Sequence, residues 1–306
     1  MKSKIFKKIA LCFASALVVC SVGAFTGCAE TDHPEVRITY EFNGATYDVD
    51  YKLYRNMYPN TVRHFIELAD EGFYNDTIIH DYQTNDWFTG GYSYDAADYA
   101  AKIDNAEQMS EYLEQWSNES AYYQLADKLT PSVYGNVGAD GKVLENTKLP
   151  TVMGEFYNNI QQDIEKGALT ADYGCLKMYY YEKQSTQRIY VTPDSRQTIL
   201  ADYKKNCATS LFALQTSQST SYNEKNYTVF AQLKEVDTFN KFVDAVKDYI
   251  TDNHSGTASE FYIRSTVNVD NLESYSNKTE NDKSIEKTFN VPKQPIIIKT
   301  VKVTKY

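Results

Sequence analysis

Histidine and cysteine, the side chains that most often build metal sites, are scarce in this sequence. The 306 residues include four histidines and five cysteines. No Cys-x-x-Cys pair and no closely spaced pair of histidines occurs among them. This spacing predicts no metal site, and we expect no cofactor.

Positive charge is also scarce outside the N-terminus. The chain has 31 Lys and Arg residues against 41 Asp and Glu residues, which gives a net charge of −10. All four charges of residues 1–27 are positive, so the remainder carries 27 positive and 41 negative charges, or −14. Because phosphate contacts require clustered Lys and Arg, this composition argues against nucleic acid as a partner.

The N-terminal hydrophobic run is too short to span a bilayer comfortably. It extends from Ile9 to Val22 and follows four lysines, which is the pattern of a signal peptide. The run leads to Phe25-Thr26-Gly27-Cys28, which resembles a bacterial lipobox. We therefore expect a signal peptide at 1–27, a lipid on Cys28 and a short tether at 28–35. The alternatives are an uncleaved signal anchor, or a cleaved signal followed by an incidental cysteine.

Two cysteines, Cys175 and Cys207, remain in the body of the chain. In an oxidising compartment they could form one disulfide. Two buried free thiols are the equally plausible alternative.

The first part of the body predicts a β-hairpin followed by a helix. Apolar residues alternate with polar ones over 36–42 and 47–53, and Asn43-Gly44 between them is a tight-turn signal. A helix should then begin near Thr61 and end at Gly72. Its apolar face leaves out His64, which we expect to be solvated.

Further elements follow at wider spacing. Residues 93–130 show helical periodicity behind an Asn105 cap, whereas 131–150 is typical of a loop. Strands are predicted at 175–181, 210–214, 227–236 and 295–303, and an amphipathic helix at 239–250. The polar stretch 252–290 is interpreted as a long surface excursion.

Several blocks, in order along the chain, resemble the cyclophilin-type peptidyl-prolyl isomerases. The most specific block is 59–80, Pro-Asn-Thr-Val-Arg-His-Phe-Ile-Glu-Leu-Ala-Asp-Glu-Gly-Phe-Tyr-Asn-Asp-Thr-Ile-Ile-His. It is similar to the family pattern P-x-T-V-x-N-F-x-x-L-A-x-x-G-F-Y-D-G-T-x-F-H-R. Shorter blocks resemble F-x-x-Q-G-G, T-I-K-x-E-F, G-V-L-S-M, Q-F-F-I and G-K-Y-T-V-F-G, at 86–91, 151–156, 174–178, 210–213 and 225–230.

The resemblance implies a mainly β fold, a closed eight-stranded antiparallel barrel capped by two helices. We expect one such domain over 36–304, with insertions at about 93–150, 182–207 and 252–290, the first of them helical. Cys175 and Cys207 flank strands that are neighbours in the family barrel, so the resemblance also places them close together.

The residues that would carry the chemistry depart from the family pattern. The family's key Arg follows its His, and here Asp81 follows His80. Two pocket glutamines correspond to Thr89 and Ser210, so we assign no catalytic residue among these four active-site positions. The resemblance implies substrate contacts from other positions, namely Trp87, Phe88, Met178, Phe212, Tyr222 and Tyr227.

Two functions follow from this resemblance. The first is a lipid-anchored isomerase at the extracytoplasmic face of the cell membrane, which assists folding of secreted proteins by binding their proline-containing segments. A displaced Arg188 or Arg196 would have to supply the missing donor. The second is a non-catalytic cyclophilin-like module that binds a peptide or partner. A solute-binding lipoprotein is a weaker third reading, since nothing indicates two similar lobes.

Overall fold

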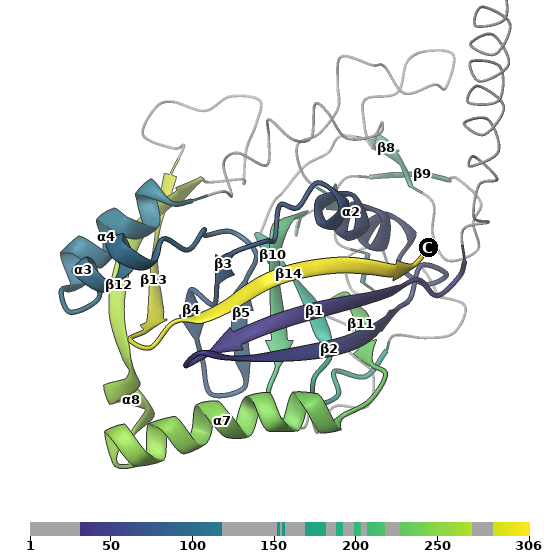
Figure 1. Cartoon of the computed structure of the whole chain (residues 1–306). Coiled ribbons are helices and arrows are strands. Elements are labelled where there is room, and N and C mark those ends of the chain that lie inside the picture. The colour runs from purple at the N-terminus through teal and green to yellow at the C-terminus, as the bar shows by residue number, and fades with distance from the viewer. Residues whose placement is uncertain are drawn as a thin grey trace, which may run out of the picture.

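The computed structural model describes residues 31–117, 152–153, 155–156, 169–181, 188–191, 199–202, 207–217, 227–270 and 284–306. Strands dominate these residues (Figure 1). The predicted signal peptide, Cys28 and the loop at 131–150 lie outside them. The predicted domain boundaries stay predictions.

One antiparallel sheet forms the centre of the molecule. Its hydrogen-bonded order is β3-β14-β1-β2-β11-β7-β10-β5-β4, and β6 pairs separately with β10. The bounds are β1 (Glu35–Phe42), β2 (Ala45–Leu53), β3 (Thr77–Ile78), β4 (Asp81–Tyr82), β5 (Asp86–Thr89), β6 (Val152–Met153), β7 (Leu176–Tyr181), β10 (Cys207–Gln215), β11 (Val229–Leu233) and β14 (Ile296–Lys305).

The two ends of this order meet in a single short segment, residues 77–82. Ile78 pairs with Ile297 of β14, and Asp81 pairs with Phe88 of β5. Between them, the amide of Ile79 donates to Ile296 O and that of His80 donates to Phe88 O. The sheet therefore curls until it returns to its starting segment. Counting β3 and β4 as one strand gives eight, and the predicted mainly β, antiparallel architecture is confirmed.

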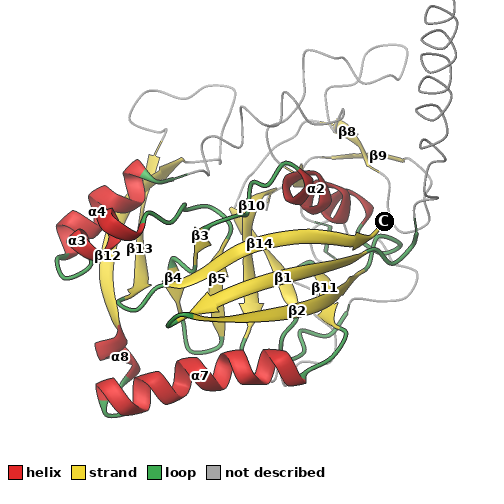
Figure 2. Ribbon diagram, in the orientation of Figure 1, coloured by secondary structure: helices red, strands yellow, loops and turns green. Residues whose placement is uncertain are grey.

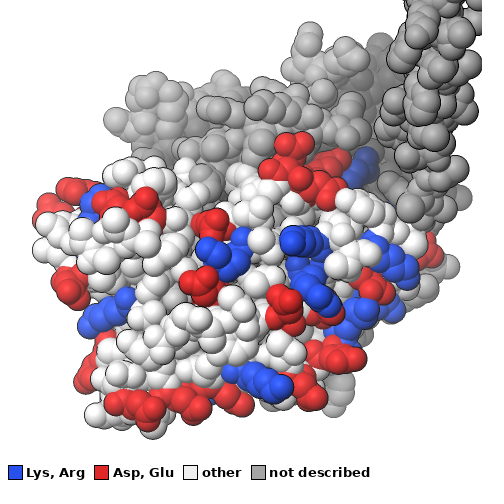
Figure 3. Space-filling model, in the orientation of Figure 1, with Lys and Arg blue, Asp and Glu red and all other residues white. Residues whose placement is uncertain are grey.

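The predicted N-terminal hairpin is confirmed. Strands β1 and β2 pair in full register from Glu35↔Lys52 to Phe42↔Ala45. The turn residues Asn43 and Gly44 have φ of 48° and 78°, as a tight two-residue hairpin turn requires. The outer face of β1, β2 and β14 carries interspersed acidic and basic side chains (Figure 3), including the pairs Arg37–Asp50 and Lys299–Asp76.

Two helices cover the apolar interior of the curled sheet, as predicted (Figure 2). Helix α7 (Asp237–His254) buries its apolar stripe, and Phe242 stacks on Tyr40 of β1 with ring centroids 4.6 Å apart. Helix α2 (Pro59–Asp70) begins two residues before the predicted Thr61, because Pro59 occupies its first turn.

The prediction that His64 is solvated is wrong. His64 is only 5% exposed. It lies three and four residues after Thr61 and Asn60, so it shares their face of α2. That face is covered by the segment around Glu155, whose carboxylate accepts from the amides of Thr61 (2.8 Å) and Asn60 (3.2 Å).

Glu155 thereby caps α2 from about a hundred residues away in sequence. Its Oε1 also accepts from Asn60 Nδ2 at 2.7 Å. A carboxylate at a helix N-terminus satisfies amides that have no partner within the helix and complements the helix dipole. The block at 151–156 therefore fixes the end of α2.

The insertions build a second layer beside the sheet. Helices α3 (Ala96–Lys102) and α4 (Ala106–Gln115) confirm the helical prediction, and Asn105 Oδ1 caps α4 by accepting from Glu107 N and Gln108 N. Helix α4 packs against β12 (Tyr262–Asp270), which pairs with β13 (Ser284–Pro292). The strands β8 (Arg188–Val191) and β9 (Ile199–Asp202) form a separate two-stranded sheet.

Residues 252–290 differ from the predicted surface excursion. Within this stretch α7 ends, α8 (Ala258–Phe261) forms one turn, and β12 and β13 form a long antiparallel ladder. The hairpin buries Val267, Phe289 and Val291. The polar Ser265 on the buried side of β12 interrupts the apolar alternation.

The predicted proximity of Cys175 and Cys207 is wrong. In the β7–β10 pair, Leu176 lies opposite Leu214 whereas Cys207 lies opposite Tyr181. Cys175, which precedes Leu176, is therefore at the opposite end of the ladder from Cys207. Cys175 is a buried free thiol. At roughly 3.3 Å per strand residue, five residues separate the ends by far more than the roughly 7 Å a disulfide tolerates.

The Glu155 cap makes stability pH-dependent. Burial raises the pKa of Glu155 to about 7, against the opposing effect of its hydrogen bonds with Thr61 and Asn60. The unfolded glutamate titrates near 4.5, so between these values the folded state holds a proton that the unfolded state has lost. The free energy of unfolding should therefore fall as pH rises from about 4.5 to about 7, and level off above.

Denaturant unfolding followed by circular dichroism between pH 5 and pH 8 measures this slope. Glu155→Gln should flatten it, whereas Glu111→Gln on the exposed face of α4 should leave it unchanged. A Glu155→Gln curve with the slope of the parent would contradict the assignment.

Candidate active site

The candidate site lies on the outer side of four neighbouring strands, β7, β10, β5 and β4. One row of paired residues crosses these strands, namely Lys177, Ala213, Phe88 and Asp81. Because successive strand residues face opposite sides of a sheet, the neighbours of this row point inward. The site therefore consists of every second residue along each of these strands, the ones that face outward.

The inward neighbours include three of the predicted substrate contacts. Trp87, Met178 and Phe212 are at most 1% exposed and belong to the hydrophobic core. The Trp87 ring stacks on Tyr82 and meets Phe242 of α7 edge to face. In this structure these side chains fill the interior and offer a ligand no exposed surface.

Thr89 and Ser210, at the positions of the two pocket glutamines, are also completely buried. Thr89 Oγ1 donates to Ile78 O at 2.9 Å, which ties β5 to β3. The Ser210 hydroxyl has no hydrogen-bond partner among the described residues. The Thr89 side chain therefore links β5 to β3 by a hydrogen bond.

An ion pair and an aromatic cluster lie on the outer face. Lys177 Nζ is 2.7 Å from Asp86 Oδ1 and 2.6 Å from Gln215 Oε1. Its ammonium also lies 5.5 Å from the centroid of the Tyr227 ring, and Tyr227 is 45% exposed. Phe88 meets Tyr179 edge to face at 5.5 Å. Phe88 and Tyr227 are thus the predicted contacts on the outer side.

His80 is enclosed by two aromatic rings. Its ring centroid is 4.6 Å from that of Tyr92 and 4.9 Å from that of Phe289 in β13. Burial lowers the pKa of His80 to about 3. The imidazole is therefore neutral at pH 7, and its Nδ1 has no hydrogen-bond partner in the described part of the chain.

Asp81 is held by hydrogen bonds from within the chain. Its Oδ1 accepts from Asn290 N of β13 at 2.9 Å, and its Oδ2 accepts from Gln83 Nε2 at 2.7 Å. Burial raises the pKa of Asp81, while both hydrogen bonds oppose that shift. Asn290 Nδ2 also donates to Tyr82 O at 3.1 Å. Across the described ranges no arginine forms an ion pair with Asp81.

The hairpin β12–β13 thus packs against the segment that bears His80 and Asp81 (Figure 1). The sequence prediction missed its contribution, Phe289 and Asn290. A signal was present, because Ile263, Val267 and Val269 in one strand, and Ile285, Phe289 and Val291 in the other, recur at even spacing. The remaining predicted residues lie outside the described structure, namely Tyr222, Cys28, Arg196 and the side chain of Arg188.

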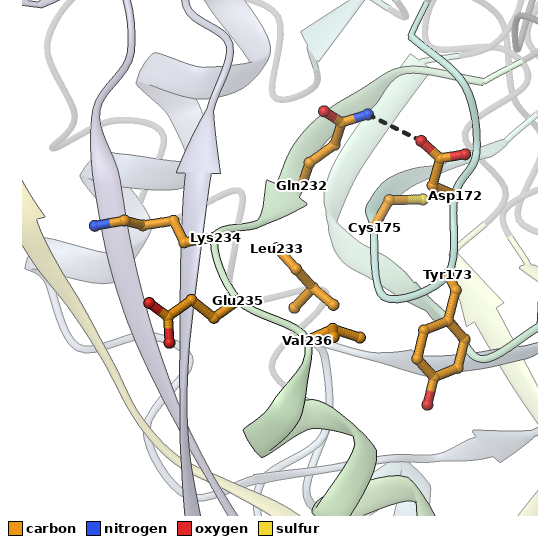
Figure 4. Close-up of a pocket in the computed structure, with 8 residues that line it drawn as sticks. All are labelled: Asp172, Tyr173, Cys175, Gln232, Leu233, Lys234, Glu235 and Val236. Atoms are coloured by element: carbon orange, nitrogen blue, oxygen red, sulfur yellow. Dashed lines mark hydrogen bonds between the residues drawn. The ribbon is translucent and has the colours of Figure 1, made fainter.

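A pocket of about 460 Å³ opens elsewhere, between the turn before β7 and the segment after β11. Figure 4 shows Asp172 and Gln232 facing one another across it, with Nε2–Oδ2 at 3.5 Å. It contains none of the predicted site residues. Among the described residues no cluster of His, Cys, Asp and Glu is suited to a metal ion.

The curled sheet, its two covering helices and the block at 59–91 define a mainly β protein of the cyclophilin class. The family model for "Cyclophilin type peptidyl-prolyl cis-trans isomerase/CLD" matches residues 37–268. The chain therefore belongs to the cyclophilin-type peptidyl-prolyl cis-trans isomerase family.

Two solved structures of one protozoan protein are similar to this chain. A cyclophilin type peptidyl-prolyl cis-trans isomerase from Cryptosporidium parvum is 15% identical, with 90% of this chain and 99% of that chain covered and a TM-score of 0.38. The structure determined in the presence of the dipeptide Ala-Pro is 15% identical, with 89% and 99% covered and a TM-score of 0.36. No curated protein matches the sequence.

The contacts of Asp81 predict that this residue is structural. Asp81→Ala leaves the half-buried amide of Asn290 without its acceptor, which should lower the free energy of unfolding by about 1–3 kcal/mol. Asp81→Asn retains an oxygen for that amide and loses only the hydrogen bond from Gln83, so it should cost less, about 0.5–1.5 kcal/mol. Urea denaturation of the two variants beside the parent measures the difference. Equal stability of Asp81→Ala and the parent would show that the Asp81–Asn290 contact contributes nothing.

Proposed function

We propose that this protein is a membrane-anchored, extracytoplasmic cyclophilin-like module that binds peptide segments and has little or no isomerase activity. The observation that carries the proposal is the state of Asp81. Both of its oxygens accept hydrogen bonds from the chain itself, one of them from the backbone of β13.

The chemistry of the reaction explains why this matters. Rotation about an X–Pro amide must overcome a barrier of roughly 18–20 kcal/mol that arises from the partial double-bond character of the C–N bond. A donor aimed at the twisting amide stabilises the transition state, as other preorganised donors do. An ionised Asp only accepts hydrogen bonds, whereas Arg offers five N–H donors. The site therefore has a divergent, non-donating residue where the family resemblance places its Arg.

Steric cover supports the same conclusion. Phe289 packs on His80, and the Asn290 amide occupies one oxygen of Asp81. A substrate proline at these two residues would have to displace β13. Asp86, at the position of the pocket aromatic, is paired with Lys177 instead, so an ion pair replaces an apolar contact.

A surface for a peptide remains beside these residues. Phe88, Tyr179 and Tyr227 lie at least partly exposed near Lys177 on the outer face. Aromatic rings that are apolar on their faces and polar at their tips suit partly solvated protein contacts. We propose that proline-containing or unfolded segments of secreted proteins bind there.

Attachment to the membrane is proposed through the lipid on Cys28. Among the helices that the structure describes, none combines the length and the apolar character needed to cross a bilayer. Residues 28–35 span less than about 30 Å even when extended, so the first strand would lie close to the lipid headgroups. This position suits a protein that meets secreted chains as they emerge.

We predict that the purified protein is a poor prolyl isomerase. Loss of one preorganised donor reduces rates by about 10²–10³ in comparable sites. The test is the exchange rate of a short X–Pro peptide measured by NMR, beside an active cyclophilin at equal concentration. Asp81→Arg alone should restore little activity, because Phe289 still covers His80. Catalysis by the parent at the rate of the active cyclophilin would refute the proposal and favour a retained isomerase with a different donor.

We also predict that Cys28→Ala releases the protein from the membrane. The lysines, the apolar run and Thr26-Gly27-Cys28 motivate this prediction. The measurement is cell fractionation of the parent and the variant, with Cys175→Ala as a matched control that should remain bound. A Cys28→Ala variant that stays with the membranes as firmly as the parent would disprove lipid anchoring at this residue.

A further inference from the structure

A second pocket lies where the base of the β12–β13 hairpin meets the turn between β4 and β5. Its volume is about 450 Å³, which is within the usual range for small-molecule sites. The turn contributes Gln83, Thr84 and Asn85, and the hairpin contributes Tyr262 and Asn290. Residues from three separate parts of the chain therefore converge on one concave surface.

The charges around this pocket are already satisfied. Asp86, which lines it, is paired with Lys177 at 2.7 Å. Asp81 behind it accepts hydrogen bonds from Asn290 N and Gln83 Nε2. None of the eight described residues that line the pocket is basic. The pocket therefore offers neither a free cation for an anion nor an unpaired carboxylate for a cation.

The groups that remain are uncharged and can exchange hydrogen bonds in both directions. The side chains of Thr84 and Asn85 are exposed and make no hydrogen bond to the described residues. Asn290 and Gln83 each use their NH₂ group, toward Tyr82 O and Asp81, so their carbonyl oxygens remain available. Together they present amide and hydroxyl groups that both donate and accept.

One tyrosine, Tyr262, adds aromatic surface to these polar groups, and the buried Tyr82 lies behind it. The rings of Tyr82 and Tyr262 lie 6.4 Å apart at 35° to one another. Tyr82 is fixed from behind, because it stacks on Trp87 at 5.3 Å. Tyr262 is half-buried at the base of β12. The Tyr262 ring therefore offers an apolar face and a hydroxyl at the same place.

We propose that this pocket binds an uncharged oligosaccharide. Sugar hydroxyls donate and accept, which matches the free amide and hydroxyl groups, and the C–H face of a pyranose ring matches a tyrosine face. A peptide that binds by strand addition would instead require a row of free backbone groups along a strand edge, whereas this pocket is lined by side chains of a turn and a hairpin base. The site adjoins the outer face of β7 and β10 through Asp86, which pairs with Lys177. The residues varied in its test lie outside the proposed peptide surface, so the test is independent of the peptide-binding proposal.

The experiment is calorimetric titration of the full chain with two probes, N,N′,N″-triacetylchitotriose and maltotriose. At least one should bind measurably at millimolar concentration. Asn85→Ala and Tyr262→Ala should each weaken binding of that sugar about three- to ten-fold, through loss of one hydrogen bond or one ring contact. Tyr306→Ala, which removes an exposed tyrosine at the other end of the chain, should bind like the parent.

Circular dichroism of each variant separates loss of the site from loss of the fold. If Tyr262→Ala unfolds, Thr84→Ala in the exposed turn replaces it and should weaken binding about three-fold. The proposal is overturned if neither sugar binds to the folded parent. It is also overturned if a sugar binds with the same affinity to Asn85→Ala and to the second folded variant.

Discussion

The fold depends on residues 77–82, the segment in which the curled sheet meets itself. Its first half pairs with the last strand of the chain, and its second half pairs with β5. The Thr89 hydroxyl bonds to Ile78 O across this seam. Gly90 follows with φ of 91°, and a Cβ there would lie 2.6 Å from Ser210 O. Only glycine fits such a close approach in the left-handed region.

This seam also carries His80 and Asp81 of the candidate site, and their side chains are therefore packed against other parts of the chain. A barrel seam must satisfy its backbone groups and exclude water, so a polar side chain on it needs a partner. Here β13 supplies that partner to Asp81, and Phe289 supplies apolar contact to His80. At the position where the family resemblance places an Arg, the Asp81 carboxylate accepts a hydrogen bond from the chain's own hairpin.

The sequence predicted those features that depend on local chemistry. Asn43-Gly44 specifies its turn through positive φ, and the apolar stripe of 239–250 specifies the buried face of α7. Prediction from the sequence failed where the burial of a residue depends on segments far away in the chain. His64 is buried although it lies outside the apolar stripe of its helix, and the buried Ser265 interrupts the apolar alternation of β12. The blocks that resemble the family fixed the positions of Trp87 and Phe212 along the chain. They did not reveal which side of the sheet each faces, and the irregular register between Ala208 and Phe212 makes this harder to infer.

Strand alternation separates the residues that hold the barrel together from those that face its outer side. In β5, Trp87 and Thr89 face inward and hold the core and the seam, whereas Asp86 and Phe88 face outward. In β7, Leu176 and Met178 face inward, whereas Lys177 and Tyr179 face outward. A substitution on the outer side alters what the surface binds but removes no core contact. The inward set is held by packing density, where a change of even one methylene is felt. The outward set, which includes the Lys177–Asp86 ion pair, is under no such packing constraint, so family membership constrains the fold of this chain more tightly than its outer surface.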